Sequence, residues 1–233
     1  MGKKMKTIGL LGGMSWESTV VYYRLINEGI KRALGGLHSA KIVLFSVDLY
    51  PIEKLIDKGD WDKTADIISE AALRVQSAGA DCILICCNTV HRIAPQIEKI
   101  IQIPLLHIVD ATADVLVHDG IRKLGLLGTT YTMEQDFYKG RLSRNYGLDV
   151  LVPEPDDRKI VHEVITQELC MGQVTDASRT EYLRIIDDLA TRGAEAIILG
   201  CTEIGILISQ RHTRVKLYDT TVIHAEKAVD YAL

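Results

Sequence analysis

An internal repeat that spans roughly half the chain is the feature that most constrains the fold. Gly-Leu-Leu-Gly at residues 9–12 recurs at residues 125–128, an offset of 116. A longer apolar segment that runs from Gly79 into Cys-Asn-Thr is matched by one that runs from Gly193 into Cys-Thr-Glu, an offset of 114. A looser pair aligns residues 108–112 with residues 217–221. Three matches in the same order predict two similar domains.

Short apolar runs alternate with longer amphipathic stretches. Strands are expected at residues 7–11, 41–47, 82–86 and 104–109, and helices at 18–34, 61–78 and about 91–100. Strands separated by helices form βαβ units, so the sheets should be mostly parallel with helices on both faces. We therefore expect an α/β fold of two pseudosymmetric Rossmann-like domains, with the active site in the cleft between them.

The repeat also predicts the domain limits. The first domain should cover residues 1–115 and the second residues 116–219, with the boundary near residues 114–123. The C-terminal helix, about residues 220–233, is expected to cross back to the first domain.

Composition excludes several classes of protein. The 233 residues are 47% hydrophobic, which is ample for a buried core and excludes a disordered chain. The 27 Lys and Arg against 31 Asp and Glu give neither the basic footprint of a nucleic-acid binder nor a polybasic membrane anchor. The first apolar run, of about six residues, is too short for a signal peptide or a membrane span. We expect a cytoplasmic protein that acts on a small molecule.

Five cysteines, an odd number, favour thiols in a reducing compartment over a disulfide framework. A thiol is most often a buried small apolar group, and Cys82, Cys86 and Cys170 are interpreted in that way. Cys87 and Cys201 differ because they occupy matching turns in the repeat, where a buried strand leads into a helix start. Such a turn offers backbone N–H groups to an anion and lowers the pKa of a thiol.

Two equivalent thiols that face one small ligand suit racemisation or epimerisation at a carbon acid. This reaction needs a base on one face of the carbon and an acid on the other, and the roles swap with direction. A metal site is not expected, because no Cys-x-x-Cys pair is present. The residues that follow the first strand do not fit a dinucleotide fingerprint or a nucleophile elbow.

Three polar residues near these turns keep two interpretations each. His91 is either a polar residue near a helix start or a group that orients the Cys87 turn and assists its proton transfer. Glu203 either accepts a ligand ammonium or fixes its turn. His224 is expected to cap a helix or to pack.

At these residues the chain resembles the aspartate/glutamate racemases that work without pyridoxal phosphate, and it looks closest to the broad-specificity amino-acid racemases. The matching motifs are Gly12-Gly13-Met14-Ser15-Trp16-Glu17-Ser18, Cys87-Asn88-Thr89-Val90-His91, Leu127-Gly128-Thr129, residues 131–138 and Gly200-Cys201-Thr202-Glu203. The resemblance implies two α/β domains, no cofactor, often a homodimer, and Cys87 and Cys201 as the acid/base pair. It further implies a substrate lined by Met14, Asn88, Thr89, Thr129, Thr202 and Glu203.

Two departures from the dedicated aspartate racemases bear on specificity. Those enzymes carry an arginine near the position of Glu53, and a lysine where this chain has Cys170. Both basic residues would pair with a side-chain carboxylate, so strict aspartate specificity is not expected.

Other reactions stay open on the same fold. Maleate isomerases, hydantoin racemases and malonate decarboxylases resemble this family and reuse one or both cysteines. A non-catalytic amino-acid-binding protein is the alternative from a different class. The paired thiols argue against it, because binding alone does not need cysteines.

Overall fold

The computed structural model describes residues 4–233. They divide into two compact units, of which the first runs to Ile108 and resumes at His224–Leu233, and the second is Val109–Ile223. Each unit has its own parallel sheet, with strand order β2-β1-β3 in the first and β5-β4-β6-β7 in the second. The predicted α/β class, with parallel sheets flanked by helices, is confirmed.

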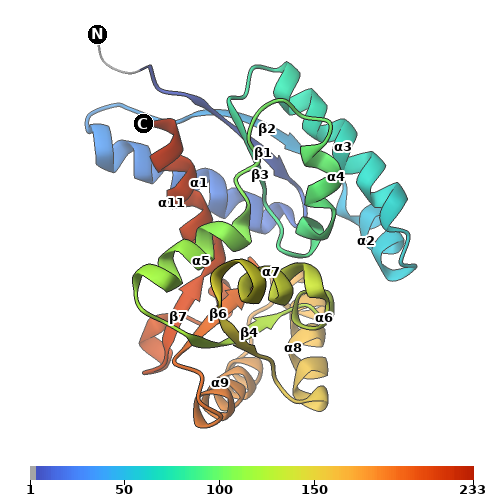
Figure 1. Ribbon diagram of the computed structural model, residues 1–233, viewed down its shortest axis with the longest axis vertical. Helices are drawn as coiled ribbons and strands as arrows, with labels where there is room; N and C mark the ends of the chain where they lie inside the picture. Colours follow the sequence, from blue (N-terminus) through green and yellow to red (C-terminus); the bar gives the residue numbers. More distant parts are fainter. Residues whose placement is uncertain (1–3) are drawn as a thin grey trace. The chain divides into compact units, whose positions relative to one another are not determined.

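The first unit begins with β1 at the centre of its sheet (Figure 1). Before the chain passes into the second unit after Ile108, the elements of the first unit are β1 (Thr7–Gly12), α1 (Trp16–Leu34), β2 (Lys41–Ser46), α2 (Leu49–Asp57), α3 (Trp61–Ser77), β3 (Cys82–Ile85), the 3-10 helix η1 (Thr89–Ile93) and α4 (Ala94–Glu98). The helix α11 (Thr220–Ala232) begins in the second unit and ends in the first.

Side chains of β1 alternate between the two faces of the first sheet. Ile8 and Leu10 pack with residues of α1 and α11, which Figure 1 shows together on one face. Gly9 faces α3 on the other side, where an added Cβ would lie 2.4 Å from Val75 Cγ1 and 2.7 Å from the Cys82 carbonyl oxygen. The glycine of the repeat is therefore required for close packing of α3 on the sheet.

The second unit repeats this plan around β4. Its elements are α5 (Ile108–His118), whose first residue still belongs to the first unit, β4 (Lys123–Gly128), α6 (Thr130–Glu134), α7 (Asp136–Tyr146), β5 (Asp149–Leu151), α8 (Pro155–Gln167), the 3-10 helix η2 (Leu169–Met171), α9 (Asp176–Thr191), β6 (Ala196–Gly200), α10 (Ile204–Leu207), the 3-10 helix η3 (Gln210–His212) and β7 (Lys216–Asp219). Gly125 matches Gly9: its added Cβ would lie 2.4 Å from Ile197 Cδ1 and 2.9 Å from Leu189 Cδ1 of α9.

Two sequence predictions about the first unit are wrong in detail. The expected strand at residues 104–109 is reduced to a bridge between Ile83 and Leu105, because α5 already begins at Ile108. The helix expected at about residues 91–100 is split into η1 and α4, and a proline in the first turn of α4 starts the second helix.

The loose third pair of the repeat is real but shifted by three residues. In the first unit Leu105 forms a bridge with Ile83, and in the second unit Leu217 pairs with Ile197 in the same way. The helix that follows begins at residue 108 in the first case (α5) and at residue 220 in the second (α11). The structural offset is therefore 112, whereas the alignment of residues 108–112 with 217–221 implied 109.

Candidate functional site

In the first unit, the predicted site residues lie at the carboxyl ends of neighbouring strands. Leu11 of β1 pairs with Ile85 of β3, so the turns that follow both strands meet at one edge of the sheet. Met14 follows β1 and is buried, and the Gly13 N–H donates to Thr19 Oγ1 over 2.8 Å. The parallel topology thus brings Met14 to the same sheet edge as the cysteine turn.

The Cys87 turn comes directly after β3. Cys87 is partly exposed, whereas Asn88 and Thr89 are buried and lead into η1. His91 Nδ1 lies 2.7 Å from the Cys87 carbonyl oxygen. The Ile108 N–H donates to His91 Nε2 over 3.2 Å, so the ring proton of the neutral imidazole is on Nδ1 and is donated to Cys87. This contact supports the interpretation that His91 orients the turn.

The rings of His107 and His224 both pack against the ring of His91. The His107 ring centroid lies 4.6 Å from that of His91, and the His224 centroid lies 5.9 Å from it. His224 bonds to Tyr22 Oη over 2.9 Å and to the Leu106 carbonyl oxygen over 2.6 Å. Burial lowers the pKa of His224 to about 4, so this ring is neutral near pH 7. His224 packs in the core, as expected.

In the second unit, the predicted residues again lie at neighbouring strand ends. Gly128 of β4 pairs with Gly200 of β6, which brings Thr129 to the same edge as the turn at Cys201. Thr129 caps α6, with its hydroxyl oxygen accepting from the Thr132 N–H over 3.4 Å. The predicted residues of this unit (Thr129, Cys201, Thr202 and Glu203) therefore share one sheet edge.

Within the Cys201 turn, the Glu203 side chain folds back and accepts hydrogen bonds from the two residues before it. Cys201 Sγ donates to Glu203 Oε2 over 2.9 Å, and Thr202 Oγ1 donates to the same oxygen over 2.8 Å. All three residues are buried. Burial, the Glu203 carboxylate and the nearby Cys170 together raise the pKa of Cys201 well above its ordinary value. The sequence-based expectation of a lowered thiol pKa is therefore wrong at Cys201.

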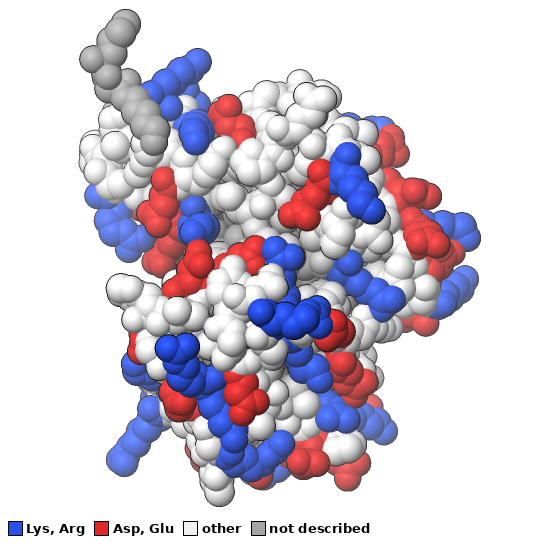
Figure 2. All heavy atoms as spheres, viewed as in Figure 1, with Lys and Arg blue, Asp and Glu red and all other residues white. Residues whose placement is uncertain are grey.

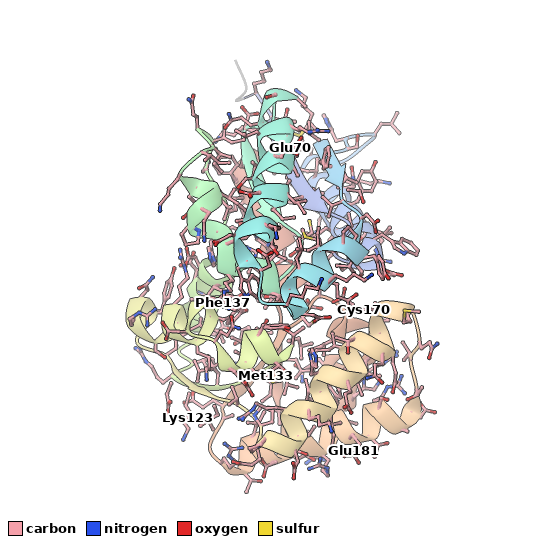
Figure 3. All side chains as sticks on the ribbon, turned by 90° about the vertical axis from the view of Figure 1, so that its right-hand side faces the viewer. Glu70, Lys123, Met133, Phe137, Cys170 and Glu181 are labelled. Carbon is pink, nitrogen blue, oxygen red and sulfur yellow. The ribbon has the colours of Figure 1, made fainter. Side chains whose placement is uncertain are left out.

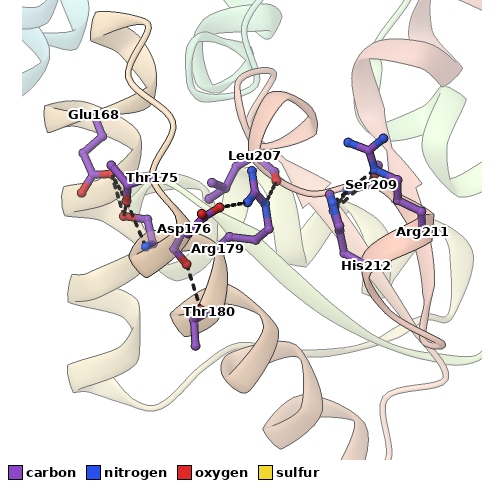
Figure 4. Close-up of polar contacts among 10 residues, drawn as sticks. Glu168, Thr175, Asp176, Arg179, Thr180, Leu207, Ser209, Arg211 and His212 are labelled. Atoms are coloured by element: carbon purple, nitrogen blue, oxygen red, sulfur yellow. Dashed lines mark hydrogen bonds and ion pairs between the residues drawn. The ribbon is translucent and has the colours of Figure 1, made fainter.

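Contacts from α9 hold the end of α8 and the end of α10, and α10 follows this turn (Figure 4). Glu168, just before η2, accepts from Ser178 Oγ over 2.6 Å. Arg179 Nε donates to the Leu207 carbonyl oxygen at the end of α10 over 3.0 Å. Cys170 lies in η2, which follows α8 (Figure 3), and it packs against the core that contains Cys201.

The remaining cysteines behave as core residues. Cys82 and Cys86 are fully buried in the first unit. Burial raises the pKa of the Cys82 thiol to about 12 and raises that of Cys86 further. All five cysteines lie in the described residues and carry thiols rather than disulfides.

Sequence reasoning missed two histidines near the turns. His107 lies in the strand expected at residues 104–109, and in the structure its ring packs on His91. His162 of α8 accepts from the Thr130 N–H over 3.4 Å, beside the end of β4. His162 and Thr130 are 32 positions apart in the sequence, so no local spacing indicates the contact.

The comparisons with known proteins are consistent with this geometry. A family model described as Asp/Glu/hydantoin racemase matches residues 11–228. The chain belongs to this racemase family. Racemases are isomerases, and the family relationship covers both units and both cysteine turns.

Individual relatives of this racemase-family chain extend over nearly its full length. A crystal structure of a candidate Asp/Glu racemase from Yersinia pestis is 51% identical, covers 98% of this chain and 99% of its own, and superposes with a TM-score of 0.91. An aspartate racemase homologue from Pyrococcus horikoshii OT3 is 30% identical over 98% and 99% of the two chains, with a TM-score of 0.83. The broad-specificity amino-acid racemase RacX of Bacillus subtilis (strain 168) is 23% identical over 95% and 96%.

The surface of this racemase-family chain carries mixed charge. Figure 2 shows Lys and Arg side chains interleaved with Asp and Glu side chains on the face drawn. Across residues 4–233, no helix is long and apolar enough to cross a membrane. Within the same residues, no three His, Cys, Asp or Glu side chains gather as a metal site requires.

Proposed function

We propose that this protein is a cofactor-independent amino-acid racemase that interconverts the L and D forms of aspartate, glutamate or a wider set of amino acids. Cys87 and Cys201 are its acid/base pair. The single observation that carries the proposal is the structural equivalence of the two cysteine turns. Each follows the strand that pairs with the central repeat strand of its own unit, β3 beside β1 and β6 beside β4.

The proposed chemistry uses one thiolate and one thiol. The thiolate takes the α-proton and forms an S–H bond, while the electron pair of the broken C–H bond stays on a planar carbanion. The other thiol then donates its proton to the opposite face of Cα and becomes a thiolate. In the reverse direction the two roles exchange. The mechanism requires that both thiols reach one substrate carbon from opposite sides.

The substrate is proposed to be held by residues next to the two thiols. Backbone N–H groups at the strand ends favour the α-carboxylate. The side chains assigned to substrate binding are Met14, Asn88, Thr89, Thr129, Thr202 and Glu203. The resemblance to dedicated aspartate racemases implies basic residues near Glu53 and at Cys170, where this chain has neither, which favours a broad range of side chains over strict aspartate specificity.

We further propose a cytoplasmic homodimer. An exposed apolar stripe on α1 supports dimer formation, because Trp16, Val20 and Tyr23 lie on one face at helical spacing and are all exposed. Size-exclusion chromatography with light scattering measures the mass directly, and a monomer at micromolar concentration would contradict this part of the proposal.

A panel of pure L- and D-amino acids tests the function. Each is incubated with the protein and separated by chiral chromatography. We expect the opposite enantiomer to appear from aspartate, glutamate or a broader group, and to approach equal amounts of both forms. A panel of dicarboxylates and hydantoins run in parallel distinguishes the related isomerases and decarboxylases. If no amino acid changes and one of those compounds does, the racemase assignment is wrong.

A further inference from the structure

The contacts of Glu203 set the two cysteine turns apart. Its Oε2 atom accepts one hydrogen bond from the Cys201 thiol over 2.9 Å and another from the Thr202 hydroxyl over 2.8 Å. The residue is only 2% exposed, so water screens this carboxylate very little. A carboxylate oxygen only accepts hydrogen bonds, and the contact with sulfur is therefore favourable only while the thiol keeps its proton.

The other titratable groups around Cys201 also favour the protonated thiol. Cys170 comes from η2 and Tyr182 from α9, and both carry either no charge or a negative one. Tyr182 donates its hydroxyl to the Val161 carbonyl oxygen over 2.8 Å, which directs that proton away from the sulfur. The Glu203 backbone N–H opposes these effects by stabilising a thiolate, but the pKa of Cys201 is still raised well above its ordinary value.

In the Cys87 turn, the position that matches Glu203 holds a different type of residue. Cys87, Asn88 and Thr89 correspond to Cys201, Thr202 and Glu203. A threonine hydroxyl carries no charge, so the Cys87 turn lacks a carboxylate at this place in the repeat. Thr89 against Glu203 is therefore the difference in charge between the two turns, beside the greater burial of Cys201.

We propose that Glu203 is a positioning residue that keeps the Cys201 thiol protonated in the resting protein, so that Cys201 is the proton donor for the enantiomer whose α-proton faces Cys87. The opposite enantiomer reacts only after water has taken the Cys201 proton and given one to Cys87. The assignment of donor rests on the proposed racemase function, whereas the protonation of Cys201 does not. Cys87 is then the base in the first step. After the transfer Cys87 carries the α-proton and Cys201 is a thiolate beside a carboxylate. Water takes one proton from Cys87 and supplies one to Cys201, which restores the resting state.

Alkylation of individual cysteines tests this proposal without substrate. The protein is treated with iodoacetamide over a range of pH, and the labelling rate of each cysteine peptide is measured by mass spectrometry. Burial slows labelling at every pH but leaves the midpoint of the profile at the pKa of the thiol. In Glu203→Gln we expect the Cys201 midpoint to fall by at least one unit, which is about a tenfold faster rate at a fixed pH below it.

Two variants serve as controls. Glu195→Gln removes one carboxylate at the opposite end of β6, where Glu195 accepts from the Lys123 N–H, and should leave the Cys201 midpoint unchanged. Glu203→Asp keeps the negative charge and should keep the midpoint close to that of the unaltered protein. The proposal is overturned if Glu203→Gln leaves the midpoint in place, or if Glu195→Gln lowers it as much.

The unaltered protein provides a measurement that does not depend on the folding of a variant. Its Cys201 midpoint should lie above that of the same peptide in urea-unfolded protein, and an equal or lower midpoint overturns the proposal. The pH profile of racemisation then separates the two claims. If the Cys201 midpoint behaves as expected while no amino acid racemises, the proposed function fails and the protonation of Cys201 stands.

Discussion

The turns at Cys87 and Cys201 have the same place in the fold and different surroundings. At Cys87 the side chain is partly exposed, and His91 donates a hydrogen bond to the backbone carbonyl of the turn. At Cys201 the side chain is buried, and the contact is made to the sulfur itself by Glu203. A repeated backbone thus supplies two equivalent cysteines, while the neighbouring side chains differentiate them. Pseudosymmetry of the fold does not imply symmetry of the thiols.

The largest expected effect comes from removing either thiol. Cys87→Ser and Cys201→Ser should each lower kcat for racemisation by about 10³-fold or more, because a serine hydroxyl is a far weaker acid than a thiol and supplies almost no conjugate base at neutral pH. Both changes are nearly isosteric, so the thermal melting temperature should stay close to that of the unaltered protein. Chiral chromatography gives the rate, and circular dichroism reports the fold.

Cys82→Ala is the matched control for this pair. It removes a thiol from the start of β3, at the end of the strand away from the turn, and should change kcat only a few-fold. A Cys87→Ser or Cys201→Ser variant with near-normal activity would contradict the pairing of the two turns.

The buried His224 ring of the first unit predicts that the protein loses stability in acid. The pKa of His224 is about 4 in the folded protein, below the ordinary 6.5, because the buried ring disfavours charge. Its contribution is therefore fully present above about pH 6.5 and is lost as the pH falls toward 4. The shift corresponds to about 3 kcal/mol of unfolding free energy. Urea unfolding at a series of pH values measures it.

His224→Gln should flatten this dependence, since glutamine does not titrate. The control is His38→Gln, which replaces an exposed histidine and should leave the slope as it was. If the two variants have the same pH dependence, the buried ring is not the source of the acid sensitivity.

His91 should affect catalysis through the backbone of the Cys87 turn alone. His91→Ala removes the donor to the Cys87 carbonyl and the acceptor of the Ile108 N–H, so we expect kcat to fall by about 10- to 100-fold with little change in KM. His91→Asn places an amide N–H near the position of Nδ1 and should restore part of the loss. Labelling of Cys201 by iodoacetamide should be the same in both variants. A change in Cys201 labelling would mean that His91 acts on both turns.

The sequence was sufficient to predict the features that depend on the repeat. The repeated Gly-Leu-Leu-Gly motifs locate the strands that became β1 and β4, and the parallel order follows from the alternation of strands and helices. Because the carboxyl ends of paired strands share an edge, Met14 could be placed beside Cys87, and Thr129 beside Cys201. Each of these inferences uses only backbone periodicity and strand order.

The errors concern features that depend on where individual side chains turn. Glu203 lies two residues after Cys201, and the sequence does not show that its carboxylate folds back onto the sulfur and raises the thiol pKa. The strand expected at residues 104–109 has the right composition, but the bond from the Ile108 N–H to His91 belongs to a helix start. His224 meets Tyr22 across 202 positions of the chain, which no local pattern reports.

Solvent exchange at Cα tests the central claim most directly. The protein is incubated in heavy water with each amino acid of the panel, and the α-proton is followed by NMR. We predict that at least one amino acid incorporates deuterium at Cα as it racemises, and that this exchange is lost or strongly reduced when both Cys87 and Cys201 are replaced by serine. The absence of exchange with every amino acid, or undiminished exchange in the double variant, would contradict the account.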